Sequence, residues 1–375
     1  MARIAVIGAG WTGAVVAREL TDAGHRVEVL ERAAVVGGHS RVETLNGVVY
    51  EPNGAHIFHT SDPTVKDYVS RFGMGRPYEH VVVTEVYLSP DDDEPRLLSW
   101  PPQVAELREL PIWPVVEREL AELPPEPIGE SFEEHVISLM GPTLYGLFIR
   151  DYTVKQWDRD PRELSARFAP KRVELRDDGY RRLFRDTWEF FEAEGVNSII
   201  EAILAPVSVT AGATISMDHA DDLAAEFDMA VITAPLDDFA GCPGELEWRG
   251  IEMRSRYVPT DTPDGTVTPA YVVNRPSLRV PYTRTVETKH ATGQSILGTV
   301  VSEEIPGSPA RHYPVPRVDG RNTTRNGELM AEIADAFDIP VLFAGRLATY
   351  RYINQDEAIT DALRCATEAL DHFAP

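Results

Sequence analysis

The chain begins with an apolar run, a helical segment and a second apolar run. Ile4–Ile7 is a short apolar run of the kind that is typical of a buried parallel strand. Residues 14–20 carry apolar side chains at helical spacing on one face. Arg26–Leu30 predicts a second strand, which ends at Glu31. Because a strand–helix–strand start is typical of doubly wound α/β folds, we expect a parallel sheet here.

The remaining pattern predicts a helical part and an antiparallel part. Residues 101–170 show helical patterning broken by prolines, which predicts several short helices. Residues 180–204 are also predicted to be helical. Residues 250–315 are rich in Val, Thr and Tyr, which favours antiparallel strands. Further expected elements are strands at 81–88, 229–235 and 341–345, a turn at 90–95 and a final helix at 357–373.

Length and composition exclude several classes of protein. A chain of 375 residues with 43% hydrophobic residues predicts two or three domains with a sizeable core. The net charge of −24, from 36 basic and 60 acidic residues, argues against a nucleic-acid or anionic-membrane surface. The two cysteines, Cys242 and Cys365, are too few for a disulfide scaffold.

The sequence shows no targeting segment. The run at Ile4–Ile7 is too short for the apolar region of a signal peptide, and no run of 18 apolar residues is present. We therefore expect a cytoplasmic protein without a membrane partner.

The loop after the first strand carries a dinucleotide-binding fingerprint. Gly8, Gly10 and Gly13 follow the Gly-x-Gly-x-x-Gly spacing between a predicted strand and a predicted helix. The first glycine permits a tight turn, the second lets backbone approach a pyrophosphate, and the third lets the helix pack on the strand. The helix N-terminus then offers free N–H groups to the phosphates. Glu31 can accept hydrogen bonds from ribose hydroxyls, and its charge disfavours NADP.

The residues after Glu31 favour FAD over NAD. Arg32 and the run Gly37-Gly38-His39 resemble the FAD-binding start of glutathione-reductase-like flavoproteins and amine oxidases. Phe343-Ala344-Gly345, followed by a helix, resembles the second flavin-contact segment of those enzymes. A helix start at that place stabilises negative charge on a reduced flavin.

Two histidines, His56 and His59, lie in the segment 54–60. Three interpretations are open for them. A metal site lacks a third nearby ligand and a HExxH motif. They could be ordinary core histidines, or they could form a polar, aromatic loop against the flavin ring. After a FAD fingerprint the third interpretation gains weight.

Residues 148–157 concentrate aromatic and hydrogen-bonding side chains. Phe148, Tyr152, Thr153 and Trp157 could together stack a nucleotide base and read its edge. The alternative is a helix whose aromatic stripe belongs to the core.

Arginines and tyrosines gather in three later segments. Arg284 ends the run 280–284, Tyr313 lies in 312–316, and Arg346 and Tyr352 lie in 345–352. Arginine forks bind diphosphates with two hydrogen bonds, and tyrosine hydroxyls donate to phosphate oxygens. Singly, each arginine could be a surface ion pair. Together they are what an acidic protein needs to hold a diphosphate.

In their order along the whole chain, these segments resemble the UDP-galactopyranose mutase family. The histidine loop, the Lys-Gln-Trp segment and the two arginine segments are specific to that family among FAD proteins. The matching pieces are Gly8–Gly13, Glu31 with Gly37-Gly38, Gly54–Thr60, Tyr152–Trp157 with Arg159–Pro161, Val280–Arg284, Tyr313–Val315 and Gly345–Ala348.

The resemblance implies an α/β fold with three domains. One is a FAD-binding Rossmann-type, glutathione-reductase-like domain, which we place at 1–80, 196–240 and 330–375. The second is a small helical domain at 100–195. The third is an antiparallel β-sheet domain at 81–99 and 241–329.

The resemblance also implies an activity. The family interconverts pyranose and furanose forms of a nucleotide-diphosphate sugar, such as UDP-galactopyranose and UDP-galactofuranose, by attack of the reduced flavin N5 on the anomeric carbon. No net oxidation occurs, yet the FAD must be reduced, which implies an external reductant such as NAD(P)H. Family members are often homodimers.

Roles for individual residues follow from the same resemblance. Arg284 and Arg346 would clamp the diphosphate, with Tyr313 and Tyr352 donating to it. Phe148, Tyr152, Thr153 and Trp157 would bind the uracil end. His56 would lie by the flavin, with His59 beside it. Further cofactor contacts are expected from Gly8, Gly10, Gly13, Glu31, Arg32, Gly38, His39, Gly345 and Arg346.

Two departures from the family pattern lie where substrate should bind. In the stretch Trp188–Val196 a phosphate-contacting tyrosine is replaced by Trp188, and glutamates add negative charge. The aspartate usual after the tyrosine-rich C-terminal segment is Asn354. The hypothesis that follows is that the flavin chemistry persists while the sugar, or the base, differs. The sugar, which could be galactose or a deoxy- or amino-sugar, and the nucleotide stay open.

Two other functions compete with a mutase. A different FAD enzyme, such as an amine or alcohol oxidase, could use this scaffold, because a fold does not fix a function. A non-catalytic sugar-nucleotide-binding relative is the other alternative.

Overall fold

The computed structural model of the chain describes residues 1–168, 173–192 and 195–374, and one of its two main sheets is parallel. The order of the five strands is β10-β2-β1-β11-β16, and every neighbouring pair is parallel. This confirms the predicted parallel sheet. The strands are β1 (Arg3–Ile7), β2 (Arg26–Glu31), β10 (Ser208–Ala211), β11 (Met229–Ile232) and β16 (Val341–Phe343).

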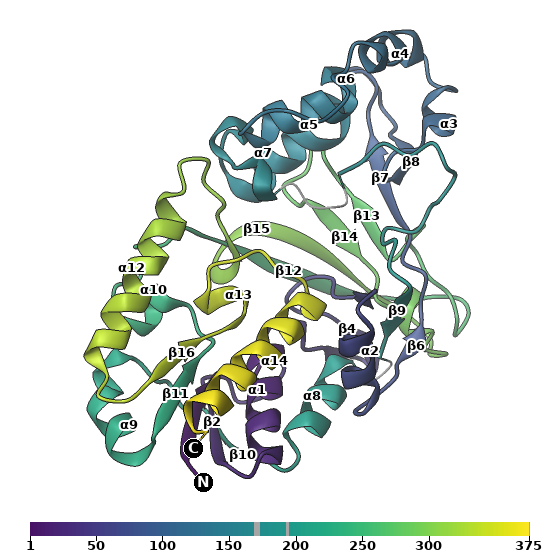
Figure 1. Ribbon diagram of the computed structural model, residues 1–375. Helices are drawn as coiled ribbons and strands as arrows, with labels where there is room; N and C mark the ends of the chain where they lie inside the picture. Colours follow the sequence, from purple (N-terminus) through teal and green to yellow (C-terminus); the bar gives the residue numbers. More distant parts are fainter. Residues whose placement is uncertain (169–172, 193–194, 375) are drawn as a thin grey trace.

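Helices cover both faces of this sheet (Figure 1). Alternate residues of β1 point to opposite faces: Ile4 and Val6 pack in one core, and Ala5 and Ile7 in the other. The first core is closed by α1 (Trp11–Asp22), α8 (Val196–Leu204) and α14 (Gln355–His372). The second is closed by α9 (Ala220–Glu226), α10 (Leu236–Phe239) and α12 (Arg321–Ala336).

A second, six-stranded sheet has the order β12-β15-β14-β13-β7-β8. All its pairs are antiparallel except β13 with β7, so the predicted antiparallel strands are confirmed with one parallel exception. Two of its strands, with the predicted turn between them, come from the early part of the chain. The strands are β7 (Val82–Val86), β8 (Arg96–Trp100), β12 (Trp248–Val258), β13 (Val272–Asn274), β14 (Arg284–Val286) and β15 (Thr299–Pro314).

Short helices form the upper part of Figure 1, as predicted for residues 101–170. They share an apolar core with the nearby ends of β7 and β8. The helices are α3 (Val104–Leu107), α4 (Trp113–Ala121), α5 (Phe132–Met140), α6 (Pro142–Leu144), a π-helix over Tyr145–Arg150 and α7 (Asp151–Trp157). Among the described residues, no helix is long and apolar enough to cross a membrane.

The helix predicted over 180–204 is wrong in its first half. Residues Trp188–Phe191 form β9, which pairs with β5 (Phe58–Thr60) and β6 (Arg76–Pro77), and the helix starts only at Val196. Aromatic side chains fit a pleated sheet well. The backbone of Gly195, with φ of +82°, interrupts helical geometry. Residues 193 and 194 of the predicted helix, including Glu194, lie outside the described residues.

Three further elements are smaller. The helix α2 (Pro63–Ser70) is capped by Asp62, whose carboxylate accepts from the Thr64 N–H at 2.8 Å. The strands β3 (Glu43–Leu45) and β4 (Val48–Tyr50) form a hairpin. This hairpin leads into the segment that carries His56.

Candidate active site

The glycine loop between β1 and α1 forms a cradle for a dinucleotide. A Cβ on Gly8 would clash with Thr233, and a Cβ on Gly13 would clash with the Gly8 carbonyl, so the packing of the protein itself requires these two glycines. Gly10 differs, because a Cβ there would meet nothing nearer than the Gly38 Cα at 3.8 Å. Gly10 is also the N-cap of α1 and has no side-chain cap. The helix N-terminus is therefore open toward the space beside Gly10 and Gly38.

Glu31 lies at the end of β2 beside this cradle. Its carboxylate accepts hydrogen bonds from the N–H groups of Ala9 and Ala33, both at 2.7 Å. These two bonds fix the acid next to the glycine loop, where a ribose would bind. Arg32 is exposed.

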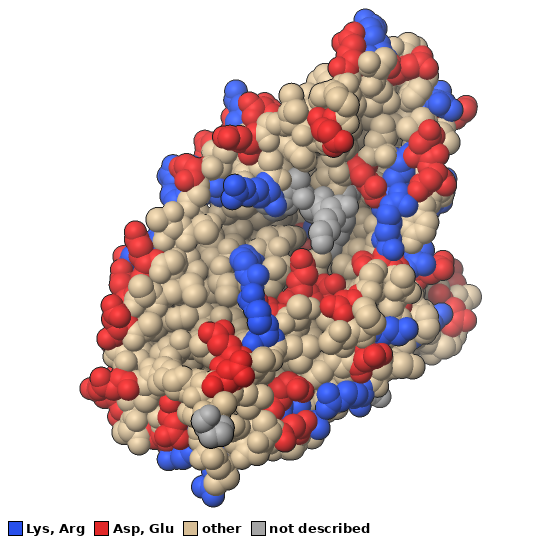
Figure 2. Space-filling model, viewed as in Figure 1, with Lys and Arg blue, Asp and Glu red and all other residues tan. Residues whose placement is uncertain are grey.

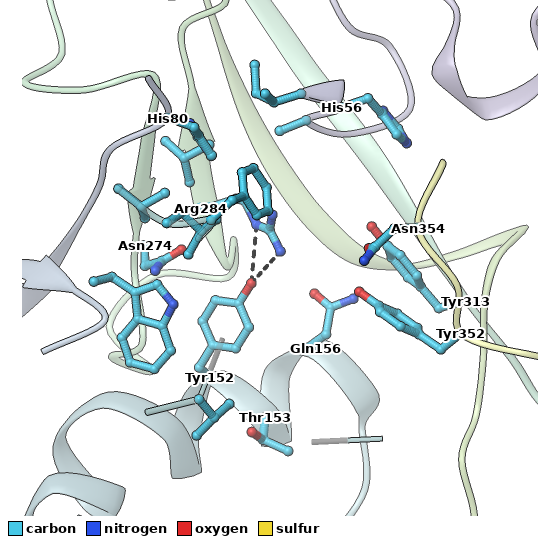
Figure 3. Close-up of a pocket in the computed structure, with 18 of the residues that line it drawn as sticks. His56, His80, Tyr152, Thr153, Gln156, Asn274, Arg284, Tyr313, Tyr352 and Asn354 are labelled. Carbon is cyan, nitrogen blue, oxygen red and sulfur yellow. Dashed lines mark hydrogen bonds between the residues drawn. The ribbon is translucent and has the colours of Figure 1, made fainter. Parts of the chain in front are cut away.

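A pocket lies between the helical part and the six-stranded sheet (Figure 3). Figure 2 shows the molecule hollowed between its upper and lower parts, with acidic side chains scattered over the outer surface. The pocket is lined by aromatic side chains, among them Trp100, Phe148 and Tyr152, and by the two arginines Arg284 and Arg346. The histidine segment 56–59 also lines it.

The helix α7 supplies one wall of the pocket. It follows directly on the π-helix that carries Phe148, and π-helical turns are frequent at functional sites. Its C-terminal carbonyls of Lys155 and Gln156 accept from the Arg249 guanidinium at 3.1 and 2.7 Å. The Lys155 ammonium lies 2.5–3.2 Å from four carbonyl oxygens of residues 275–282, the loop that leads to Arg284. Burial lowers the pKa of Lys155 to about 8.

Arg284 is held by two partners. Its Nη2 donates to the Tyr152 hydroxyl at 2.7 Å, and its Nε lies 3.2 Å from a carboxylate oxygen of Glu304. Glu304 is fully buried and lies directly opposite Arg284 in the β14–β15 ladder. A buried carboxylate fixes a guanidinium in place because both groups would otherwise lose their hydration without compensation. Arg284 is thus oriented toward the pocket before any ligand binds.

Arg346 is surrounded by aromatic rings and carbonyls. It belongs to the short helix α13 (Gly345–Ala348), and its Nε donates to the Ile353 carbonyl at 3.0 Å. Its guanidinium lies 5.7 and 5.3 Å from the ring centres of Tyr313 and Tyr352, which stack on each other. The arginine therefore presents its charge between two phenols that can donate to an anion.

Asn354 lines the pocket and caps a helix. It is the N-cap of α14 and forms a capping box with Glu357, whose carboxylate accepts from the Asn354 N–H at 2.9 Å. Asparagine and aspartate cap helices about equally well. The departure at this position therefore leaves the fold intact and changes only the charge that faces the pocket.

Three imidazoles beside Arg346 are held neutral. Burial, reinforced by Arg346, lowers the pKa of His56 to about 3 and that of His312 to about 4, and burial lowers the pKa of His39 well below its usual value. The rings of His39 and His312 stack at 4.5 Å, and His56 Nδ1 lies 2.7 Å from the Gly54 carbonyl oxygen. His59 is different, because its Nδ1 lies 2.7 Å from the Asp186 carboxylate.

A buried acid supports the histidine segment from behind. Glu51 is 1% exposed, accepts from the His56 N–H at 2.8 Å and accepts from the hydroxyl of Tyr271. Burial raises the pKa of Glu51 to about 8. These hydrogen bonds connect the backbone of His56 to Glu51, which directly follows β4, and through it to Tyr271, which directly precedes β13.

Comparisons with known proteins agree with this geometry. Residues 147–352, which include α7, Arg284 and Arg346, match the family model of UDP-galactopyranose mutase. The chain belongs to the UDP-galactopyranose mutase family. Residues 6–72 match the model of an NAD(P)-binding Rossmann-like domain. Membership confirms the predicted family and the prediction of an isomerase that acts as a nucleotide-sugar pyranose–furanose mutase.

Relatives that match over nearly their full length are named as mutases of two different nucleotide sugars. The chain is 28% identical to the probable UDP-galactopyranose mutase of Klebsiella pneumoniae, with 99% of the chain and 95% of the relative covered. It is 26% identical to the dTDP-fucopyranose mutase of Escherichia coli, with 98% of each covered. A crystal structure of reduced UDP-galactopyranose mutase matches with a TM-score of 0.78 at 18% identity, covering 100% of the chain and 97% of that structure. The last match confirms the predicted fold class.

The structure brings most residues predicted for the mutase site into one pocket. The predicted residues that line it are His56, His59, Phe148, Tyr152, Thr153, Trp157, Arg284, Tyr313, Arg346, Tyr352 and Asn354. Trp188 does not line it. That side chain lies on β9 and packs against Phe58 and Phe190, with ring centres 5.7 and 4.7 Å away.

Several residues at or beside the pocket were missed from the sequence. Gln156 and Asn274 line it, and Glu304 and Glu51 hold Arg284 and the His56 segment from behind. Gln156 belongs to the Lys-Gln-Trp segment, which is one of the family motifs identified in the sequence. The two acids carry no local signal, because Glu304 meets Arg284 only through strand pairing and Glu51 meets Tyr271, 220 residues away, only in the folded core.

Replacing Lys155 with methionine is expected to raise the KM for the nucleotide sugar roughly tenfold with little change in kcat. The ammonium that ties the loop 275–282 to α7 is lost, while the groups that face the pocket remain. Steady-state kinetics of the reduced enzyme measures both constants. Lys66→Met, at an exposed position on α2, is the control. A KM equal to the wild-type value would refute this positioning role.

Replacing Glu51 with glutamine is expected to stabilise the fold more at pH 8 than at pH 5. The acid has a raised pKa in the folded state, so its contribution to stability is present below pH ~4.5 and is lost as the pH rises toward 8. Glutamine keeps an acceptor for the His56 N–H and cannot ionise. The difference in free energy of unfolding between variant and wild type, from urea titrations, should grow by at least about 1 kcal/mol over this interval. A difference independent of pH would contradict the buried-acid assignment.

Proposed function

We propose that the protein is a FAD-dependent mutase that interconverts the pyranose and furanose forms of a nucleotide-diphosphate sugar. The observation that carries this proposal is the position of Arg284 and Arg346. They come from two distant elements, β14 and α13, and line one pocket, together with side chains of α7 and the histidine segment.

The residues present fit FAD. The glycine cradle at Gly10 and Gly38 leaves open the space that a pyrophosphate needs, and Glu31 stands at the ribose position. The neutral imidazoles of His39 and His56 lie near Arg346 and the start of α13. When bound and reduced by an external reductant such as NAD(P)H, FAD would supply a nucleophilic N5 for attack at the anomeric carbon of the sugar.

The chain itself binds the substrate and stabilises the leaving diphosphate. Phe148 and Tyr152 offer ring faces to the base. Arg284 and Arg346, with the hydroxyls of Tyr313 and Tyr352, stabilise the negative charge that develops on the diphosphate when the bond to the sugar breaks. The same groups hold the diphosphate close while the sugar rearranges, which favours its return.

His56 contributes an uncharged polar group at the sugar end. Because its Nδ1 lies against the Gly54 carbonyl, this nitrogen carries the proton and Nε2 is the acceptor. A neutral His56 leaves Arg346 as the charged group next to the reacting centre. Its role is to orient a sugar hydroxyl or a flavin edge.

A panel of sugar nucleotides tests the function and the substrate together. FAD-loaded protein is reduced with dithionite and incubated with UDP-galactopyranose, dTDP-fucopyranose and amino-sugar analogues, and the products are separated by chromatography. A furanose product from at least one donor is expected. Bleaching of oxidised flavin by a donor alone, with an oxidised sugar as product, would instead identify an oxidase.

A further inference from the structure

Gln156 is a pocket residue without an assigned role. Its side chain is 5% exposed and lines the pocket. Its Oε1 is buried and has no hydrogen-bond partner among the residues that the structure describes. Figure 3 shows the amide pointing into the cavity between Tyr152 and Tyr352. A buried acceptor without a partner is costly, so this oxygen is suited to a donor that a ligand brings.

The order of groups along the pocket indicates which part of a ligand reaches Gln156. Phe148 and Trp100 lie together in the pocket, with ring centres 6.0 Å apart. Arg284 donates to the Tyr152 hydroxyl, and Arg346 lies 5.3 Å from the ring centre of Tyr352. Gln156 lies between Tyr152 and Tyr352 (Figure 3), one helical turn beyond Tyr152 on the same face of α7. A nucleoside diphosphate carries its ribose between its base and its phosphates.

We propose that the Gln156 Oε1 accepts a hydrogen bond from a ribose hydroxyl, which makes Gln156 the residue that selects an intact ribonucleoside diphosphate. This inference rests on the proposed function, because it assumes a nucleotide sugar in the pocket. A ribose hydroxyl is a neutral donor and matches a neutral amide oxygen. A deoxy analogue leaves this oxygen buried and unpartnered, and sites built to bind a substrate hydroxyl reject analogues that lack it.

The alternative ligand groups fit this oxygen less well. Phosphate oxygens are acceptors and would face the acceptor Oε1 with repulsion. The base is proposed to stack on the ring faces of Phe148 and Tyr152, and the phosphates are proposed to bind Arg284 and Arg346.

Binding of UDP, 2′-deoxy-UDP and 3′-deoxy-UDP to the FAD-loaded protein tests this role by isothermal titration. At least one deoxy analogue should bind wild-type protein roughly tenfold or more weakly than UDP. In Gln156→Leu this ratio should fall to near one. In Val154→Ala, on the exposed face of the same helix, it should persist. Weaker binding of 2′-deoxy-UDP than of UDP would in addition indicate that the pocket prefers UDP-sugars to dTDP-sugars, because dTDP lacks the 2′-hydroxyl.

Two results would overturn the inference. Equal affinity of wild-type protein for all three ligands would show that no ribose hydroxyl contributes to binding. If the affinity ratio between UDP and the deoxy analogue stays unchanged in Gln156→Leu, another residue binds the ribose hydroxyl. If Gln156→Leu does not fold, Gln156→Glu serves instead, because it keeps an acceptor at this position. It should retain the affinity ratio while charge repulsion weakens the binding of all three ligands. Loss of the affinity ratio in Gln156→Glu would refute the role of Gln156 as the acceptor for a ribose hydroxyl. Failure of UDP itself to bind would overturn the proposed function as well.

Discussion

Replacing Arg284 with alanine is expected to lower turnover at least about 100-fold while FAD remains bound. Removing one partner of a close charge pair costs roughly 2–5 kcal/mol, which corresponds to a rate loss of roughly 30- to 5,000-fold. The loss should lie toward the upper end, because the fully buried Glu304 would then face the diphosphate without its counter-charge. Turnover is measured by chromatography of the sugar nucleotides, and FAD content by absorbance.

Two variants make this prediction specific. Arg254→Ala removes an exposed arginine on β12, whose side chain is 64% exposed, and should retain wild-type turnover. Arg284→Ala combined with Glu304→Gln should recover part of the lost activity, because the uncompensated carboxylate is gone. Near-normal turnover in Arg284→Ala would refute its role as a diphosphate ligand. The same assay applied to Arg346→Ala tests the second arginine.

Replacing Gly10 with alanine is expected to weaken FAD binding at least about tenfold without destabilising the apoprotein. The backbone at Gly10 has φ of −82°, which alanine adopts, and the added methyl group meets no protein atom nearer than 3.8 Å. The methyl group would occupy the space beside Gly38 that a pyrophosphate needs. Fluorescence titration gives the FAD affinity, and thermal unfolding gives the stability.

The neighbouring glycine provides a matched contrast. A Cβ at Gly13 would clash with the Gly8 carbonyl, so Gly13→Ala should destabilise the apoprotein itself, by about 1–3 kcal/mol or more. Gly10→Ala and Gly13→Ala therefore separate the binding role of the loop from its packing role. Wild-type FAD affinity in Gly10→Ala would contradict the placement of the cofactor at this cradle.

Local motifs made the dinucleotide cradle and the pocket predictable from the sequence. Gly8, Gly10 and Gly13 are close along the chain, and their spacing itself encodes the turn before α1. Tyr152 with Gln156, and Thr153 with Trp157, are each four residues apart, so helical periodicity places each pair on one side of α7. The resemblance to a family then supplied what periodicity could not, namely that Arg284 and Arg346 share one site.

Residues that depend on long-range register were not predictable. Glu304 faces Arg284 only because β14 and β15 pair in that register. Glu51 and Tyr271 are 220 residues apart and meet only in the folded core. The aromatic run around Trp188 fits both a helix and a strand, and its pairing with β5 decides the outcome. This pairing also takes Trp188 out of the pocket.

Chromatography of UDP-galactofuranose after incubation with FAD-loaded protein, with and without dithionite, tests the central claim most directly. The account predicts conversion to the pyranose form in the reduced sample and none in the oxidised sample, with no oxidised sugar in either. Equal conversion in both samples, or an oxidised sugar as the product, would contradict a mutase that works through reduced flavin.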